Sequence, residues 1–207
     1  MTTLYRHVAE RPDAEFHFET GRRLAERLGY PAGWLNAVPA EALASFAGVG
    51  HMLDLAAIQS GETVLDLGAG SGTDAFIAAW LTGPSGRVLG VDMTDAQLAK
   101  ARRLRDARGL AQLAFVEGLI EEPPAERGVF DVVISNGAIN LAPDMPAVFR
   151  EVARALRPGG RLAIAVIVGA VPAHDYLAAI EAAGLRIDTV RPNKYGVTSL
   201  SLLAVKP

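Results

Sequence analysis

The chain contains no cysteine among its 207 residues, which excludes disulfides, thiolate metal sites and thiol nucleophiles. It also lacks any apolar run of the ~20 residues needed to span a membrane, and its N-terminus lacks the apolar core of a signal peptide. A formal net charge of −3 gives no general attraction to nucleic acid or anionic lipid. We therefore expect a cytoplasmic protein that binds neither nucleic acid nor membranes and holds no metal.

Hydrophobic residues make up 50% of the chain and charged residues 21%, which is ordinary for a globular protein of one domain. Up to about residue 60 the pattern indicates several short helices, and Pro31 and Pro39 lie where first-turn prolines are common. We treat residues 1–57 as an N-terminal helical cap or lid and residues 58–207 as the main domain, the two forming one structural unit.

After residue 60, strand-like apolar runs alternate with helical patterns. The runs are at 62–67, 87–91, 112–117, 130–135 and 161–168. This alternation predicts βαβ units and a mainly parallel sheet covered on both faces. Two further strands, within 185–193 and 198–207, have no helix between them and must pair as an antiparallel hairpin. The expected fold is α/β, with a Rossmann-like seven-stranded sheet.

The helix after the second strand is expected to begin with a capping box formed by Thr94 and Gln97 and to end at Gly109. It carries the only dense basic run of the chain, KARRLRDAR, at residues 100–108. Aromatic residues do not interrupt this run, so a solvated helix face is a simpler interpretation than an RNA-binding surface.

The stretch VLDLGAGSGTD, residues 64–74, connects the first strand to a helix that begins near Thr73. Gly68, Gly70 and Gly72 allow a tight turn and a close approach of a ligand to the backbone. Free N–H groups at the start of the helix suit a carboxylate. Because ligands of open parallel sheets bind at the carboxyl ends of the strands, this turn is a candidate binding site.

Two acids narrow the choice of ligand. Asp66, at the end of the first strand, would repel a pyrophosphate but can face an ammonium or sulfonium group. Asp92 ends the second strand, twenty residues after Gly72, and can accept hydrogen bonds from both hydroxyls of a ribose. A ligand with ribose hydroxyls, an amino-acid end and no phosphate is S-adenosyl-L-methionine. The alternative is that the two acids only cap the elements that follow them.

Four stretches carry a resemblance to a known family. They are ETVLDLGAGSGTDAFIAA, GRVLGVDMT, FDVVISNGAINLAPD and VFREVARALRPGGRLAI. In this order they resemble class I S-adenosylmethionine-dependent methyltransferases, and the similarity extends over roughly residues 38–168. Within this family the sequence most resembles the arsenite methyltransferase branch, and its resemblance to the quinone C-methyltransferases is more distant. The resemblance implies a class I methyltransferase sheet and methyl transfer from S-adenosyl-L-methionine to a small-molecule acceptor.

The resemblance also implies which residues hold the cofactor. The glycine turn would line its methionine end and Asp92 its ribose, while Met93 would pack on the adenine. The backbone of Leu119 and Ile120 would read the adenine edge, and Asn136 would lie near the transferring methyl group. The full set of expected cofactor-binding residues is Asp66, Gly68, Gly70, Gly72, Thr73, Asp74, Asp92, Met93, Gly118, Leu119, Ile120 and Asn136.

The chain departs from the arsenite methyltransferases at their arsenic-binding cysteines. Val49 and Gly137 occupy two of those positions, and the insertion after the fifth strand that carries the others is missing. Since arsenic(III) prefers thiolate ligands, we expect an acceptor other than arsenite. Leu119 stands where such enzymes usually place an acid that accepts from the adenine. These departures keep an alternative open: a catalytically inactive protein that binds S-adenosylmethionine or S-adenosylhomocysteine, as a pseudoenzyme or regulatory partner.

Few side chains are candidates for chemistry, because the sulfonium is already activated and the protein must mainly align the reactants. The candidate catalytic residues are His51, Asn140 and His17, each of which also has a structural interpretation. The candidate substrate-binding residues are Phe16, Phe18, Tyr30 and Gly137. The aromatics of the first 55 residues favour a lid over an apolar or aromatic acceptor. Either this segment or a second copy in a homodimer would cover the pocket.

Overall fold

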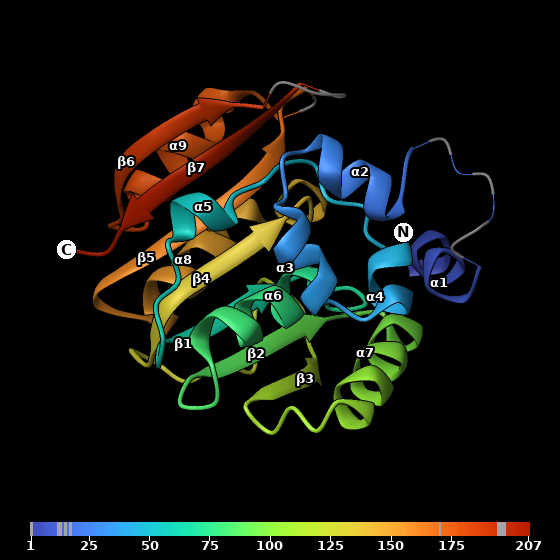
Figure 1. Ribbon diagram of the computed structural model, residues 1–207. Coiled ribbons are helices and arrows are strands. Elements are labelled where there is room, and N and C mark those ends of the chain that lie inside the picture. The colour runs from blue at the N-terminus through green and yellow to red at the C-terminus, as the bar shows by residue number, and fades with distance from the viewer. Residues whose placement is uncertain (1, 12–13, 15, 17, 170, 194–197) are drawn as a thin grey trace.

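The computed structural model describes residues 2–11, 14, 16, 18–169, 171–193 and 198–207. A seven-stranded sheet in the order β3-β2-β1-β4-β5-β7-β6 forms the middle layer (Figure 1). The strands are β1 (Thr63–Leu67), β2 (Arg87–Asp92), β3 (Leu113–Glu117), β4 (Phe130–Asn136), β5 (Leu156–Ile167), β6 (Arg186–Pro192) and β7 (Ser199–Val205). The helices are α1 (Thr2–Glu10), α2 (Gly21–Arg27), α3 (Ala32–Ala37), α4 (Ala40–Ala44), α5 (Leu53–Ala56), α6 (Thr73–Thr82), α7 (Asp95–Ala107), the 3₁₀ turn η1 (Ile139–Leu141), α8 (Met145–Ala155) and α9 (Ala173–Ala182).

The sheet confirms the expected α/β class. Strands β1 to β5 run parallel, β7 runs antiparallel to β5, and β6 pairs antiparallel with β7 as the C-terminal hairpin. The main difference from the expected bounds is in β5, which begins at Leu156 rather than at 161. Leu156 already pairs with Phe130, before a register shift in the β4–β5 ladder.

Both faces of the sheet are buried, in two separate apolar clusters. Val64 and Val132 face the side covered by α6 and α7, whereas Leu65 and Val133 face the side covered by α8 and α9. Successive residues of a strand point to opposite faces, so a strand covered on both sides is apolar at most positions. This is why the strands are continuous apolar runs in the sequence.

The N-terminal helices pack on the same face of the sheet as α6. Leu35 of α3, Leu43 of α4 and Leu53 of α5 belong to the same buried cluster as Phe76 of α6. Helix α1 lies against α7 (Figure 1). The cap and the sheet therefore share a hydrophobic core. Within the described ranges, none of the helices combines the length and the apolar character needed to cross a membrane.

Helix α7 begins and ends near the expected residues, but its start is built differently. The side chain of Thr94 accepts no capping hydrogen bond, and Ser71 instead donates to Oε1 of Gln97. The capping-box prediction is therefore wrong.

In the basic run of α7, Arg102 donates to the carbonyl of Phe115 at 3.0 Å and Arg103 pairs with Glu41. These contacts within the chain support the interpretation of the run as a surface face of the helix.

The strand order places the glycine turn at a switch point. The chain passes from β1 outward to β2 and β3, and then returns to β4 on the other side of β1. The loops that follow β1 and β4 therefore leave in opposite directions and open a crevice at the carboxyl edge of the sheet. Asp66 and Gly68 lie at this edge beside Asp92 of β2 and Asn136 of β4.

Replacing Gly72 with alanine should destabilise the fold. Gly72 has φ +93°, and a Cβ atom there would lie 2.6 Å from Cζ of Phe115. Gly109→Ala is a matched control, because Gly109 also has a positive φ (+60°) but no atom within 4 Å of its Cβ position. Overpacking should make Gly72→Ala about 1–3 kcal/mol more destabilising than the control in urea unfolding. Equal losses in the two variants would contradict this packing role.

Candidate functional site

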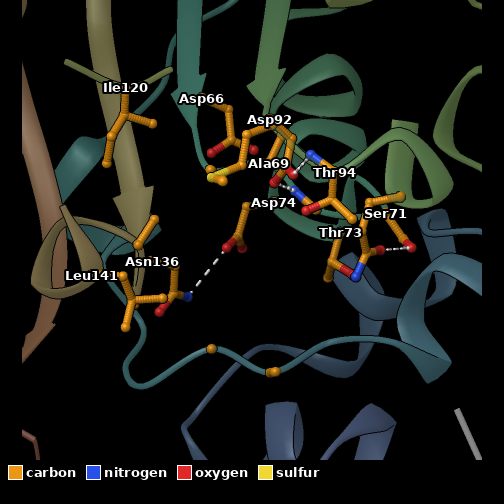
Figure 2. A pocket seen from close by; sticks show the side chains of 18 of the residues that line it. Asp66, Ala69, Ser71, Thr73, Asp74, Asp92, Thr94, Ile120, Asn136 and Leu141 are labelled. Atoms are coloured by element: carbon orange, nitrogen blue, oxygen red, sulfur yellow. Dashed lines mark hydrogen bonds between the residues drawn. The ribbon is translucent and has the colours of Figure 1, made fainter. Parts of the chain in front are cut away.

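A cavity of about 370 Å³ opens at the carboxyl edge of the sheet (Figure 2). Its walls are the glycine turn, the ends of β2 and β3, the loop after β4, and residues 45–48 ahead of β1. The expected site residues that line it are Asp66, Gly68, Gly70, Thr73, Asp74, Asp92, Met93, Gly118, Leu119, Ile120, Asn136 and Gly137. Segments far apart in sequence thus meet in one cavity.

Gly72 lies beside the cavity rather than in its lining. Gly72 is the N-cap of α6 and is not part of the cavity lining. A side chain there would strike Phe115 and Phe76 rather than a ligand. Gly68 differs, because it lines the cavity and its Cβ would lie 2.2 Å from that of Ala138 in the loop after β4.

The carboxyl group of Asp66 is buried in the cavity wall with one oxygen unsatisfied. Its Oδ2 has no hydrogen-bond partner, while a backbone hydrogen bond comes from Ala75. Burial raises the pKa of Asp66 well above its ordinary value, and the neighbouring carboxyls of Asp74 and Asp92 add to the rise. A buried carboxylate without a partner is costly. This wall is therefore suited to a ligand that brings a positive charge.

Asp74 is held by two side chains from distant elements. Tyr30 donates its hydroxyl to Oδ1 at 2.7 Å. Asn136 donates Nδ2 to Oδ2 at 3.1 Å (Figure 2). Burial raises the pKa of Asp74 to about 6, although these two hydrogen bonds act to lower it. Asn136 also accepts from the backbone N–H of Val49 at 2.8 Å. Asp74 is thus fixed in direction and remains titratable near neutral pH.

Asp92 organises the turn and keeps capacity for a ligand. Its Oδ2 accepts from the N–H of Gly70 and its Oδ1 from the N–H of Thr94, each at 2.8 Å. An ionised carboxylate has about four acceptor sites. Two remain, as many as a pair of ribose hydroxyls requires.

The outer part of the cavity is apolar. Met93 and Leu119 are about half exposed, at 50% and 53%, which is unusual for large hydrophobic side chains of this chain. Both line the cavity, together with Ile120. Such a rim can pack on the faces of a flat aromatic ring system.

The comparisons with known proteins bear on this cavity. Residues 58–185 match the family described as a methyltransferase domain. An arsenite methyltransferase from Halobacterium salinarum is 43% identical over 157 residues, which are 76% of this chain and 40% of that protein. The chain belongs to the class I S-adenosylmethionine-dependent methyltransferases. Its sheet, with the antiparallel C-terminal hairpin, is the sheet of that family.

Two further similar proteins are matched by this chain over a larger share of their own length. Nocamycin O-methyltransferase from Saccharothrix syringae is 30% identical over 155 residues, which are 75% of this chain and 55% of that protein. A solved arsenic(III) S-adenosylmethionine methyltransferase from Chlamydomonas reinhardtii has a TM-score of 0.70 and 30% identity, over 84% of this chain and 71% of that chain. The methyltransferase spans about two fifths of the Halobacterium relative, so the activities of the longer proteins do not transfer to it directly.

The family cofactor, S-adenosyl-L-methionine, fits the residues present in the cavity. The unpartnered oxygen of Asp66 suits its ammonium group, and the free acceptor sites of Asp92 suit its ribose. The apolar rim at Met93 and Leu119 suits its adenine. Among the residues that the structure places, no group of three or more His, Cys, Asp or Glu side chains could hold a metal ion.

Two of the three candidate catalytic residues, His51 and Asn140, do not line the cavity, and the third lies outside the described part of the chain. His51 is not in the cavity lining; its ring centroid is 4.4 Å from that of Tyr30 and 5.6 Å from that of Trp34. Burial lowers the pKa of His51. Asn140, in η1, is also outside the lining, and its Oδ1 is buried without a partner. His17 lies outside the described residues.

Of the aromatics expected in a lid, Phe46 lines the cavity, whereas the three proposed as substrate contacts do not. Phe16 and Phe18 are in a non-helical segment, where their rings stack at 5.6 Å, and neither lines the cavity. Tyr30 is buried and acts through Asp74 rather than by touching the cavity space. Of the expected substrate contacts, only Gly137 lines the cavity. The N-terminal segment contributes its roof through residues 45–48 instead.

Some lining residues were not expected from the sequence. They are Ser45, Ala47, Gly48, Ala69, Ser71, Thr94, Gln97, Glu121, Ala138, Leu141, Ala142 and Pro143. The spacing of Gln97 from Thr94 predicted a capping box, so its place in the site was not predicted. Its hydrogen bond with Ser71 joins α7 to the glycine turn. The glycine at position 48 is the one indication in the sequence. A Cβ there would lie 2.6 Å from Nδ2 of Asn136, so this part of the chain passes close to the site.

Proposed function

We propose that this methyltransferase transfers the methyl group of S-adenosyl-L-methionine to a small-molecule acceptor other than arsenite. The observation that carries the proposal is the unpartnered carboxylate oxygen of Asp66 beside the buried carboxyl of Asp74. Two acids in the wall of a largely apolar cavity suit a cation. The cofactor supplies one in its ammonium and another in the sulfonium that carries the methyl group.

The residues of the chain would divide the binding between them. The backbone at Gly68 and Gly70 would hold the methionine end, and Asp92 would accept from the ribose. Met93 and the backbone of Leu119 would hold the adenine. The chain's part in catalysis would then be to align the reactants and exclude water, since the bond to be broken is already activated.

The side chain of Asn136 helps to fix residues 45–48, the roof of the cavity. Asn136 accepts from Val49 and donates to the carbonyl of Gly50 at 3.0 Å. Ser199 of β7 donates to the carbonyl of Val49 at 2.8 Å. Three backbone groups ahead of β1 are thus tied to the sheet, which supports residues 45–48 as a fixed wall of the acceptor space.

The exclusion of arsenite rests on two positions that face each other. A Cβ at Gly137 would lie 3.2 Å from Cγ1 of Val49, so the positions that resemble the arsenic-binding cysteines are neighbours here. Neither carries a thiol, and the chain has no cysteine elsewhere. A relative that is named as an O-methyltransferase supports the idea that this kind of domain serves other acceptors.

Incubation with arsenite, a reducing thiol and S-adenosyl-L-methionine should therefore give no methylated arsenic above the background without protein. Arsenic(III) needs thiolate ligands that the chain lacks. Arsenic species would be separated and counted, with an authentic arsenite methyltransferase as the positive control. Methylated arsenic that increases in proportion to this protein would reject the proposed acceptor range. Cofactor binding without turnover of any acceptor would favour the non-catalytic alternative.

A further inference from the structure

Tyr30 connects the N-terminal cap to the wall of the cavity, although it does not line the cavity. It follows α2 in the chain, and its ring packs edge-on against that of Phe46, with the centroids 5.3 Å apart. The residue is buried, with 3% of its surface exposed. A buried hydroxyl needs hydrogen-bond partners within the protein. The partners of the Tyr30 hydroxyl therefore indicate what the residue does for the site.

The hydroxyl of Tyr30 lies between two side chains of the cavity lining. It donates to Oδ1 of Asp74 at 2.7 Å and accepts from Nδ2 of Asn136 at 2.9 Å. A second acceptor, the carbonyl of Gly50, is farther away, at 3.4 Å. Since a hydroxyl has one proton to donate and a carboxylate is a stronger acceptor than a carbonyl, the proton of Tyr30 points to Asp74. A residue of the cap thus supports a carboxyl group of the cavity wall.

Burial and hydrogen bonding act on Asp74 in opposite directions. Burial raises the pKa of Asp74 to about 6, whereas the hydrogen bonds from Tyr30 and Asn136 act to lower it. A hydrogen bond to the charged form of a group favours that form. Asn136 makes the longer contact, at 3.1 Å (Figure 2), and also donates to the carbonyl of Gly50. Tyr30 is therefore the donor that contributes most to keeping Asp74 ionised.

The other groups around this contact that can carry a charge are mostly acids. They are Asp66, Asp92 and Glu117 near the carboxyl ends of β1, β2 and β3, His51 beside the Tyr30 ring, and Lys100 beside Ser45. Helix α3, which also packs on α6, carries no ionisable side chain. The three carboxyls oppose the ionisation of Asp74, since like charges repel. Burial lowers the pKa of His51, which favours its neutral form. The ammonium of Lys100 donates to Oγ of Ser45 and to the carbonyl of Ala9.

We propose that Tyr30 is a positioning residue of the cofactor site, whose hydroxyl keeps Asp74 ionised and so able to attract the positive charge of the cofactor. This inference rests on the proposed function, because it assigns that charge to the wall formed by Asp66 and Asp74. The cap then takes part in cofactor binding without touching the cofactor. The pH range over which the protein holds its cofactor depends on a residue that lies 44 positions before the carboxyl group in the chain.

Calorimetric titrations of S-adenosylhomocysteine into the whole chain and into its Tyr30→Phe variant, at pH 5 to 9, test the inference. Phenylalanine keeps the ring and removes the hydroxyl, so Asp74 should hold its proton at a higher pH. Since a hydrogen bond to a charged group corresponds to about one pKa unit or more, the variant should bind about tenfold more weakly at pH 5. The ratio of the two dissociation constants should fall towards one at pH 9, where Asp74 is ionised in both proteins. A role of the hydroxyl in the fold alone would give the same ratio at every pH.

Matched proteins separate the effect on Asp74 from an effect on the fold. Tyr176→Phe also removes a buried tyrosine hydroxyl, but one that donates to the carbonyl of Ile167, so its ratio should stay near one at every pH. In an Asp74→Asn background, adding Tyr30→Phe should give a ratio that no longer changes with pH, because the titrating group is gone. If Tyr30→Phe does not fold, replacing the tyrosines with 3-fluorotyrosine keeps the ring and makes the hydroxyl a stronger donor. That protein should lose less affinity between pH 9 and pH 5 than the unmodified chain.

A ratio for Tyr30→Phe that is the same at every pH, or within twofold of one at pH 5, would overturn the inference. The same holds if the protein with 3-fluorotyrosine loses as much affinity at pH 5 as the unmodified chain. If S-adenosylhomocysteine does not bind the unmodified chain at any pH, the proposed function falls together with the inference. If it binds and the ratio does not change with pH, only the inference falls.

Discussion

Replacing Asp92 with alanine should weaken S-adenosylhomocysteine binding by about tenfold to a hundredfold. A hydrogen bond to a charged group contributes about 1.5–3 kcal/mol, and two ribose hydroxyls would share this carboxylate. The variant also removes the acceptor for the N–H groups of Gly70 and Thr94, which Asp92 holds at 2.8 Å. The turn that would hold the methionine end therefore loses a support at the same time. Calorimetric titration measures the loss.

Two controls separate binding from folding in this experiment. Asp188→Ala removes a carboxylate from the edge strand β6, away from the cavity lining, and should leave the dissociation constant unchanged. Asp92→Asn keeps one acceptor oxygen and should fall between the wild type and Asp92→Ala. The thermal midpoint of each variant shows whether the fold is intact. A dissociation constant for Asp92→Ala within twofold of the wild type would remove Asp92 from the binding site.

The fold could be predicted from the sequence because its signals are local and repeated. Strands buried on both faces are continuous apolar runs, and the missing helix between the last two strands specifies the hairpin. The start of α6 at Thr73 follows from the glycines ahead of it. The site at the carboxyl edge follows from the parallel sheet, so Asp66 and Asp92 could be placed together from their positions at strand ends, whereas Asn136 was placed through the family resemblance.

The cap and the neighbours of the site could not be placed in the same way. Tyr30 contributes through a hydrogen bond to Asp74, a residue 44 positions later in the chain, and no periodic pattern records such a contact. Phe16 and Phe18 suggested a lid by composition alone, but their rings stack on each other. A glycine of the motif can also be needed for packing, as Gly72 is against Phe115. Long-range side-chain contacts decided each of these cases.

Cofactor affinity should fall as the pH is lowered from 8 to 5. Burial raises the pKa of Asp74 to about 6, and burial with the charges of Asp74 and Asp92 raises the pKa of Asp66 well above its ordinary value. Below pH 6 Asp74 holds a proton, so the wall loses negative charge that would attract the ammonium of the ligand. One proton linked to binding changes the affinity by up to about tenfold per pH unit. The side chains that donate to Asp74, Tyr30 and Asn136, do not supply a compensating positive charge.

The stability of the ligand-free protein should change with pH in the opposite direction. A carboxyl whose pKa is higher in the folded state than in the unfolded state stabilises the fold at low pH, and this contribution is lost as the pH rises through the folded-state pKa, here about 6 for Asp74. Asp66→Asn removes a carboxyl whose ionisation is opposed by burial, so it should raise the thermal midpoint at pH 8 and weaken S-adenosylhomocysteine binding there, while Asp188→Asn should do neither. Titrations at pH 5, 6, 7 and 8, each in two buffers of different ionisation enthalpy, would count the protons released on binding. Affinity that is equal or higher at pH 5 would show that the ligand does not meet the ionised pair. If affinity falls with falling pH as expected, the two buried acids would contribute to binding because the cofactor would bring the positive charge that the fold does not place beside them.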